Sequence, residues 1–492
     1  MSGYLKRLVS SLGAYQLANA VSMALAVLLL PVYTRYVTPT GYGVVETLAT
    51  FVIFISIVVR FGMIESFLRF YFSDEDPERR NALVRRAVRF LVVTTTVAAV
   101  ALVIPAAPLA RLVTTTNRPW DFRVAVLGVW AFTNLELAYA LLRVDERLRA
   151  YAVASVSNVA LTVIASVILV VGFGQGALGL LIANYGAALV VLLGLWWAMR
   201  DRLRIRSAVS EPLSGLLHFG LPTVPAEASV YALSVLDRQY LVHACSAAAV
   251  GFYSLAIKLA GAVAFIVRAF QYAWPPLAYS VKDEREAGRL YGLVTTYYVL
   301  ISGWVVAGLG LEARWILRLL AAPRFFEAYR AVPWVSLGWA MYGLWVVLLV
   351  IAGRAKVTRR NFPAALVGLA VNVVLLILLV PDYGIAGAGV ALCGAYVGML
   401  GVMYLLVRRA FPVTFEWRRL ALIVVVMSVL TVTGDLFLPT SGAGGLLLRA
   451  VVFLAIPPAL LLTGFPHPQE LTQARLLAKR LRSYRVAGRG VA

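Results

Sequence analysis

Two arginines and one lysine lie within long apolar stretches of the chain. Arg60 and Arg268 each follow a glycine by 17 residues (Gly43 and Gly251), and Lys258 follows Gly251 by seven. An arginine binds a diphosphate through paired, charge-assisted hydrogen bonds. An unpaired ammonium in hydrocarbon costs about 2.5–3.5 kcal/mol, so Lys258 must face water or a carboxylate. These residues predict a cationic site for an anionic substrate.

A second interpretation of the two arginines stays open. At 1.5 Å per residue they lie about 25 Å into their helices, near the cytoplasmic end of an apolar slab about 30 Å thick. Long arginine side chains can reach the lipid headgroups from there. Against this interpretation, both helices are expected to continue past Arg60 and Arg268, and an internal repeat would bring the two residues to the interface between two halves.

Three acids are candidates for gating or coupling. Glu227, near the middle of its apolar stretch, is the carboxylate expected to pair with Lys258. Such a pair either only locks two helices together, or it opens when protonation or substrate competes for the lysine. Glu46 and Glu65 lie in the same region as Arg60 and are the other two candidates.

The internal repeat has a period of 208 residues. Its matches include Gly43 with Gly251, Arg60 with Arg268, Glu227 with Asn19, Gly176 with Gly384, and Gly179 with Gly387. Asn19 therefore joins the candidates for substrate binding. Arg35, at the outer end of the first apolar segment, is a further candidate that either anchors the segment or guides the substrate out.

The composition indicates that the helices carrying these charges belong to a membrane protein. Of 492 residues, 61% are hydrophobic and only 14% are charged, which no soluble globular fold needs. A spanning helix takes about 20 apolar residues, and about fourteen such segments can be placed along the chain. Their expected ranges are 10–33, 43–66, 87–109, 121–142, 152–172, 177–198, 214–241, 250–272, 290–310, 328–351, 362–380, 385–407, 419–437 and 445–464.

The distribution of basic residues over the loops predicts the orientation. They gather near 69–89, 143–149, 200–206, 282–289, 354–360, 408–419 and after 475, whereas the loops near 173–176, 381–384 and 438–444 have none. The loops 110–123 and 311–330, with three and four arginines, are exceptions that the larger number outweighs. By the positive-inside rule, both termini are cytoplasmic in a multi-pass protein of the cell membrane. The net charge of +22 is spread over these loops, which argues against a nucleic-acid partner and for contact with membrane lipids.

Six spans in each half return the chain to its starting side, so the halves are expected to be parallel repeats. We therefore expect an all-α membrane fold with two six-helix bundles related by a pseudo-two-fold axis normal to the membrane, followed by two further helices. The expected ranges are 1–211 and 212–410 for the halves, 411–465 for the added helices and 466–492 for a basic cytoplasmic tail.

Little in the sequence could support catalysis. The three histidines (His218, His243 and His467) have no nucleophile at a suitable spacing, and no glycine-rich phosphate motif with a lysine occurs. Cys245 and Cys393 lie in apolar surroundings, which indicates neither a disulfide framework nor a metal cluster. We expect no enzyme activity, no metal and no cofactor.

Five short motifs lie along the chain. They read GMIESFLRFY at 62–71, FGLP at 219–222, LDR at 236–238, VGFYSLAIKL at 250–259 and PDYGIAGA at 381–388. Together with the layout of six, six and two spans, they resemble the polysaccharide-export, O-antigen (Wzx-like) flippases. These belong to the MOP (multidrug/oligosaccharidyl-lipid/polysaccharide) transporter superfamily.

The resemblance implies a transporter that flips an undecaprenyl-diphosphate-linked oligosaccharide, a polysaccharide or O-antigen repeat unit, from the cytoplasmic to the outer leaflet. Alternating access would pass it through a central cationic cavity. We expect a monomeric transport unit, with polysaccharide polymerase and assembly proteins as candidate partners. Two alternatives in the superfamily remain open: a multidrug cation antiporter of the MATE type, which would line its cavity with acids, and a peptidoglycan lipid-precursor flippase.

Overall fold

The computed structural model describes residues 29–72, 76–204, 213–357 and 360–467, and all of the regular structure in them is helical. Asn19, most of the expected first span and most of the expected tail lie outside these residues. The helices of the first half are α2 (Leu30–Tyr36), α3 (Pro39–Val59), α4 (Met63–Tyr71), α5 (Pro77–Val103), α6 (Ala106–Thr114), α7 (Pro119–Val144), α8 (Leu148–Ser166), the π-helix η1 (Val167–Gly172), α9 (Gly176–Ala198) and α10 (Arg200–Arg204).

The second half contains longer helices. They are α11 (Leu213–Gly220), α12 (Thr223–Ala244), α13 (Ala247–Leu259), α14 (Gly261–Ser280), α15 (Glu284–Leu320), the 3-10 helix η2 (Pro323–Arg330), α16 (Val332–Arg354), α17 (Asn361–Val407), α18 (Trp417–Phe437) and α19 (Gly442–Leu462). Within α17, Gly384 adopts φ 54° and ψ −127°, so two helices meet there. The break falls at the boundary expected between the spans 362–380 and 385–407.

Ten of the described helices are long and apolar enough to cross a membrane. The pair α13 and α14, bent by 49° between them, adds an eleventh candidate span. The prediction of an all-α, multi-pass membrane protein is therefore confirmed.

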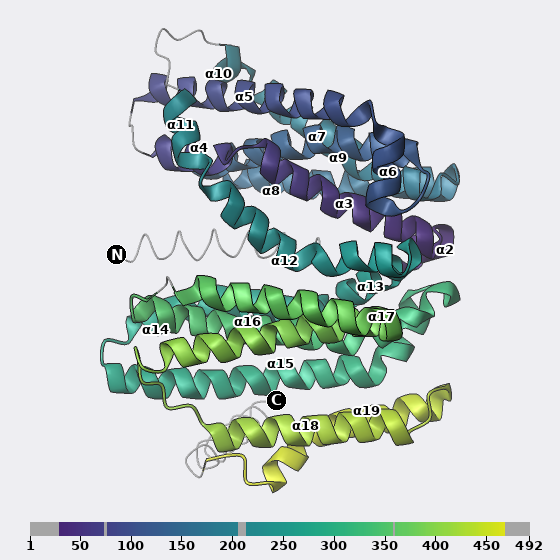
Figure 1. Cartoon of the computed structure of the whole chain (residues 1–492), viewed down its shortest axis with the longest axis vertical. Coiled ribbons are helices and arrows are strands. Elements are labelled where there is room, and N and C mark those ends of the chain that lie inside the picture. Colours follow the sequence, from purple (N-terminus) through teal and green to yellow (C-terminus); the bar gives the residue numbers. More distant parts are fainter. Residues whose placement is uncertain (1–28, 73–75, 205–212, 358–359, 468–492) are drawn as a thin grey trace, which may run out of the picture. The chain divides into compact units, whose positions relative to one another are not determined.

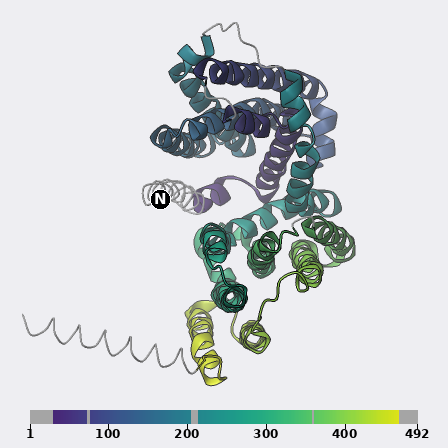
Figure 2. The ribbon, with the colours of Figure 1, turned by 90° about the vertical axis from the view of Figure 1, so that its left-hand side faces the viewer.

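The chain forms two compact units. The first contains the described residues of Met1–Gly261 with Ile316–Val335 and Leu366–Ala395, and the second contains those of Ala262–Trp315, Ser336–Ala365 and Tyr396–Ala492. In the first unit, α7 packs between α5 and α9, and α8 packs on α9 (Figure 1). In the second unit, α15 and α18 are viewed nearly along their axes in Figure 2, so the two helices run along a similar direction.

The core of the first unit is built from apolar side chains of α4, α5, α7, α8, α9 and α11. Phe67 on α4, Leu91 on α5, Leu141 on α7, Leu192 on α9 and Leu216 on α11 are all buried in one cluster. This packing fixes α4 and α11 against the bundle. The ends of α3 and α12, which lead into those two helices, are fixed by the same contacts.

α3 and α13 cross where the repeat pairs two glycines. A Cβ on Gly43 would lie 1.6 Å from the carbonyl oxygen of Ala247, and a Cβ on Gly251 would lie 2.3 Å from that of Pro39. The two contacts exchange under the shift of 208 residues, as reciprocal contacts about a two-fold axis do. The repeat inferred from the sequence is thus present in the geometry of this crossing.

The caps of the same two helices follow the repeat as well. The Thr38 hydroxyl accepts a hydrogen bond from the backbone N–H of Gly41 at 3.1 Å, and the Ser246 hydroxyl accepts one from that of Ala249 at 3.2 Å. Both residues are N-caps, which satisfy an otherwise unpaired donor at the helix start. Donor and acceptor in the two caps again differ by 208 residues.

The expectation that both helices continue past the matched arginines is wrong for one of them. α14 continues well beyond Arg268, but α3 ends at Arg60, after which Phe61 and Gly62 adopt left-handed φ values of 49° and 68°. A Cβ on Gly62 would lie 2.0 Å from the carbonyl oxygen of Gly220. The chain turns at this point because α4 and α11 approach each other backbone to backbone.

Candidate functional site

Lys258 lies in a cluster of three side chains where α3 and α13 meet. Its Nζ donates a hydrogen bond to Glu46 Oε1 at 2.7 Å and contacts the Tyr42 hydroxyl. The ammonium also lies 4.7 Å from the centre of the Tyr42 ring, and that ring is buried against Phe325 of η2. A carboxylate and an aromatic face together compensate the charge, as an ammonium within an apolar unit requires.

The predicted pair between Lys258 and Glu227 is not formed. Lys258 pairs instead with Glu46, because α3 rather than α12 packs directly along α13 at the glycine crossing. Glu46 follows Gly43 by one helical turn and Lys258 follows Gly251 by two, so each lies on the face that carries its glycine. That spacing was the signal in the sequence that favoured Glu46.

Glu227 belongs to a second cluster, centred on Arg60 at the C-terminal end of α3. One guanidinium nitrogen, Nη2, contacts Glu227 Oε1 and lies 3.4 Å from Glu65 Oε1. Arg60 is 9% exposed, whereas the two carboxylates are about one-third exposed. One guanidinium between two carboxylates leaves this cluster with an excess negative charge.

Several polar atoms of the Arg60 cluster have no hydrogen-bond partner. They are Arg60 Nε, Glu65 Oε2 and Glu227 Oε2, all shielded from solvent. Glu136 on α7, for which the sequence indicated no role, lies within electrostatic range of Arg60. The cluster can therefore take up a further ligand, either an anion on the guanidinium or a proton on a carboxylate.

The two clusters occupy opposite ends of α3. Glu46 and Arg60 are 14 residues apart, which corresponds to about 21 Å along a helix. Each cluster holds a cation already engaged by carboxylates, so each can exchange one anionic partner for another. Five of the predicted site residues are thus assembled in two places rather than one.

The other predicted site residues lie apart from these clusters. Arg35 is exposed in the last turn of α2, and Arg268 is exposed on α14 in the second unit. Asn19 lies outside the described residues. Among the residues that the structure describes, no group of His, Cys, Asp and Glu side chains is arranged to hold a metal ion.

Asp237 and Arg238 belong to the LDR motif and lie near the C-terminal end of α12. The Asp237 side chain is buried within the first unit, where its Oδ1 accepts a hydrogen bond from the Arg238 backbone N–H at 2.8 Å. The guanidinium Nε of Arg238 has no hydrogen-bond partner. The burial of Asp237 follows from the packing of α12 on both α3 and α13.

Asp435, also without an assigned role in the sequence, anchors the last two helices. Its Oδ1 lies 3.0 Å from Nη1 of Arg449 on α19 and 3.0 Å from Nη1 of Arg314 on α15. Arg449 is fully buried and also donates to the backbone carbonyls of Leu311 and Leu438. This network is structural, since a buried arginine must find such acceptors.

Comparisons with known proteins identify the fold. Among solved structures, the chain is similar to the lipid II flippase MurJ in an inward closed conformation, with 12% identity and a TM-score of 0.72 over 91% of this chain and 97% of that chain. It is similar to an inward-facing multidrug resistance MATE family transporter of the MOP superfamily, with 14% identity and a TM-score of 0.62 over 79% and 94% of the two chains. For the Vibrio cholerae MATE transporter VcmN, the identity is 15% and the TM-score 0.52 over 83% and 97% of the chains.

A comparison with curated protein sequences found no match. The profile of one family, described as polysaccharide biosynthesis protein, matches residues 8–278, more than half of the chain. The structural similarities at such low identity establish the fold, and the family profile establishes the relationship. The chain therefore belongs to the polysaccharide biosynthesis protein family and has the fold of the MOP transporters.

Proposed function

We propose that this protein flips an undecaprenyl-diphosphate-linked oligosaccharide from the cytoplasmic to the outer leaflet by alternating access. The observation that carries the proposal is the Arg60 cluster, in which two carboxylates hold a largely buried guanidinium that a diphosphate can take over. Membership in the polysaccharide biosynthesis family supports a saccharide cargo. The fold shared with a lipid II flippase supports a lipid-linked one.

Arg60 acts by exchanging its anionic partners. In the empty protein Glu65 and Glu227 neutralise the guanidinium, which lowers the cost of keeping it away from water. A diphosphate offers more acceptor oxygens and more charge than a single carboxylate, so it displaces Glu227. Lys258, about 21 Å away along α3, is a second cation to which the diphosphate can pass on displacing Glu46.

Glu227 is the acid that we nominate for coupling. Its protonation would remove one of the two charges that compete with substrate for Arg60. It therefore gates Arg60 rather than Lys258. The coupling proton or ion would act at this pair, on the side of the unit where α3 ends.

The remaining sequence expectations belong to the same proposal. Both termini are cytoplasmic, and the halves 1–211 and 212–410 form the moving parts, with 411–465 as an addition. The transport unit is a monomer in the cell membrane. Its partners are the polymerase and assembly proteins that would use the exported saccharide.

One observation favours a second candidate function. Glu65 and Glu227 pair with Arg60, and Glu136 lies within electrostatic range of Arg143 and Arg60. Carboxylates gathered in this way suit the binding of a cationic drug or a proton, as in a MATE-type antiporter. A peptidoglycan lipid-precursor flippase differs from our first proposal only in the saccharide, so the same cationic chemistry would serve it.

The test is flipping of a fluorescent undecaprenyl-diphosphate saccharide in proteoliposomes. We expect Arg60→Gln and Lys258→Met each to slow flipping about tenfold or more, since a hydrogen bond to a charged group contributes about 1.5–3 kcal/mol. Arg149→Gln is the matched control, because Arg149 is exposed on α8 and outside both clusters. Wild-type rates in both variants would refute the proposal.

The same proteoliposomes separate the alternatives. Proton-coupled ethidium transport without saccharide flipping would establish the antiporter instead. Glu227→Gln should bind substrate more tightly, turn over more slowly and lose the pH dependence of flipping. A variant that keeps the wild-type rate and pH dependence would make Glu227 a structural partner of Arg60 and nothing more.

A further inference from the structure

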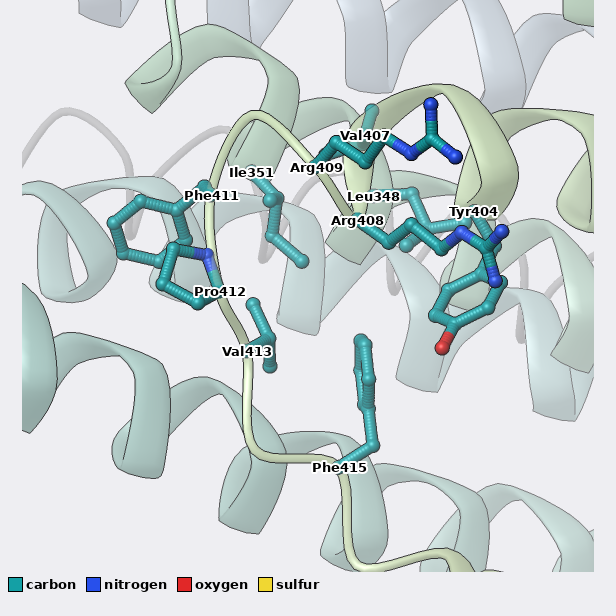
Figure 3. A pocket seen from close by; sticks show the side chains of 10 residues that line it. All are labelled: Leu348, Ile351, Tyr404, Val407, Arg408, Arg409, Phe411, Pro412, Val413 and Phe415. Carbon is teal, nitrogen blue, oxygen red and sulfur yellow. The ribbon is translucent and has the colours of Figure 1, made fainter.

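A pocket of about 360 Å³ lies in the second unit (Figure 3), and none of the residues of the two charge clusters lines it. It is bounded by α16, by the end of α17 and by residues 411–416, an extended segment that leads to α18 and that we call the strap. Its wall is apolar and includes Leu348, Ile351, Phe411 and Val413, and its lining includes Arg408 and Arg409. The volume falls within the range of small-ligand sites.

The strap lies in close backbone contact with α15. A Cβ on Gly288 of α15 would lie 2.6 Å from the carbonyl oxygen of Pro412, and a Cβ on Gly292 would lie 2.0 Å from that of Thr414. The Thr414 backbone N–H also donates to the Gly288 carbonyl at 3.3 Å. Two glycines one helical turn apart thus let the strap lie directly on α15, which gives the pocket a preformed wall.

The two arginines of the pocket carry charge that no acid of the described residues compensates. Neither Arg408 nor Arg409 forms an ion pair within the part of the chain that the structure describes, and both are exposed. The nearest acid along the strap, Glu416, is engaged at 3.0 Å by Arg419 and at 2.9 Å by His467. Exposed, uncompensated guanidinium groups beside an apolar wall suit an amphiphile with an anionic head.

Aromatic residues place the pocket at the depth of lipid headgroups. Tyr404, Phe415 and Trp417 form a cluster with ring centres 5.5–5.9 Å apart, and Trp417 is exposed. Such clusters mark the membrane–water interface. The arginine-rich segment 408–419 is one of the loops assigned to the cytoplasmic side, where the leaflet carries anionic lipids.

We propose that this pocket binds the headgroup phosphate of an anionic phospholipid of the inner leaflet. Arg408 and Arg409 hold the phosphate, and the apolar wall of Ile351, Phe411 and Val413 accommodates the adjoining part of the lipid. The bound lipid fastens the strap, and with it α18, to the second unit. This site is independent of the transported substrate.

The experiment measures retention of phosphatidylglycerol by the delipidated full-length protein, by native mass spectrometry, with phosphatidylcholine as the neutral comparison. An arginine near an anionic surface contributes about 1 kcal/mol, so Arg408→Gln and Arg409→Gln should each weaken phosphatidylglycerol binding about fivefold. Arg418→Gln removes the same charge from an exposed residue, the second of α18, which does not line the pocket. It should have a much smaller effect, and an equal loss in all three variants would mean unspecific attraction and overturn the proposal.

A variant that keeps both charges tests the pocket itself. Val413→Trp fills it from the strap and should abolish selective retention of phosphatidylglycerol while its melting temperature without lipid matches that of the wild type. Soluble glycerol phosphate should not compete at the same phosphate concentration. Undiminished binding by Val413→Trp, or equal binding of glycerol phosphate, would overturn the assignment to a membrane lipid.

Discussion

The glycine crossing of α3 and α13 gives the sharpest quantitative prediction. A Cβ at Gly43 would lie 1.6 Å from the carbonyl oxygen of Ala247, whereas real Cβ atoms stay at least 3.0 Å from other atoms. Gly43→Ala therefore requires the helices to separate by at least 1.4 Å, the difference between those two distances. For Gly251→Ala the contact is 2.3 Å from the Pro39 carbonyl, so the required shift is 0.7 Å.

The larger required shift predicts the larger loss of stability. Overpacking costs about 1–3 kcal/mol, and a helical carbonyl cannot rotate aside as a side chain can. The higher helix propensity of alanine stabilises the helix by up to about 1 kcal/mol relative to glycine. The free energy of unfolding should therefore fall by about 2 kcal/mol for Gly43→Ala and by less for Gly251→Ala. The separation also pulls Lys258 from Glu46, whose atoms lie 2.7 Å apart, and should slow transport.

The assay is thermal unfolding of the purified protein in detergent, followed by tryptophan fluorescence. Gly194→Ala is the matched control, since Gly194 lies in α9 and its added Cβ would meet nothing within 4 Å. We expect the melting temperature to fall in the order Gly194→Ala, Gly251→Ala, Gly43→Ala. A Gly43→Ala protein as stable as the Gly194→Ala protein would refute the close crossing.

Two further predictions concern the second unit. Arg449→Met should lower the free energy of unfolding by about 1–3 kcal/mol, because it leaves the backbone carbonyls of Leu311 and Leu438 without this donor. Arg418→Met on the exposed face of α18 should change it little, and equal melting temperatures in the two variants would contradict the network. Burial tends to raise the pKa of Glu416, but hydrogen bonds and the charge of Arg419 outweigh it and hold that pKa below its ordinary 4.5. The pair therefore stabilises the fold above about pH 4.5 and ceases to do so as the pH falls through the lowered pKa. Wild type should lose more stability than Glu416→Gln in a melting series at falling pH, and parallel curves would show that the carboxylate contributes nothing.

The membrane class and the repeat could be predicted because both depend on residues near one another in the chain. A run of about 20 apolar residues partitions into a bilayer wherever it occurs. The repeat is carried by residue identities such as Gly43 with Gly251 and Arg60 with Arg268. Their spacing of 208 residues can be read from the sequence without knowledge of the packing.

The sequence predicts which charged residues form the candidate site but not how they pair. Arg60 and Lys258 could be recognised from the cost of a charge in an apolar stretch, and so could the acids that neutralise them. The pairing of each acid with its cation could not be predicted from the sequence, because Glu46 and Glu227 each come near a cation only when α3 packs on α12 and α13. The same holds for Asp435, whose partner Arg449 lies on another helix.

The sequence by itself determines the apolar segments and the repeat, because each depends only on which residues occur along the chain and how they are spaced. The tertiary structure alone decided that α3 ends at Arg60, that Lys258 pairs with Glu46, and that the strap at 411–416 forms a pocket with α16 and α17. Each of these depends on where two helices approach within a few ångströms and on how each is rotated about its axis. A difference of one residue in that rotation turns a side chain by about 100°, and no pattern along a single segment specifies it.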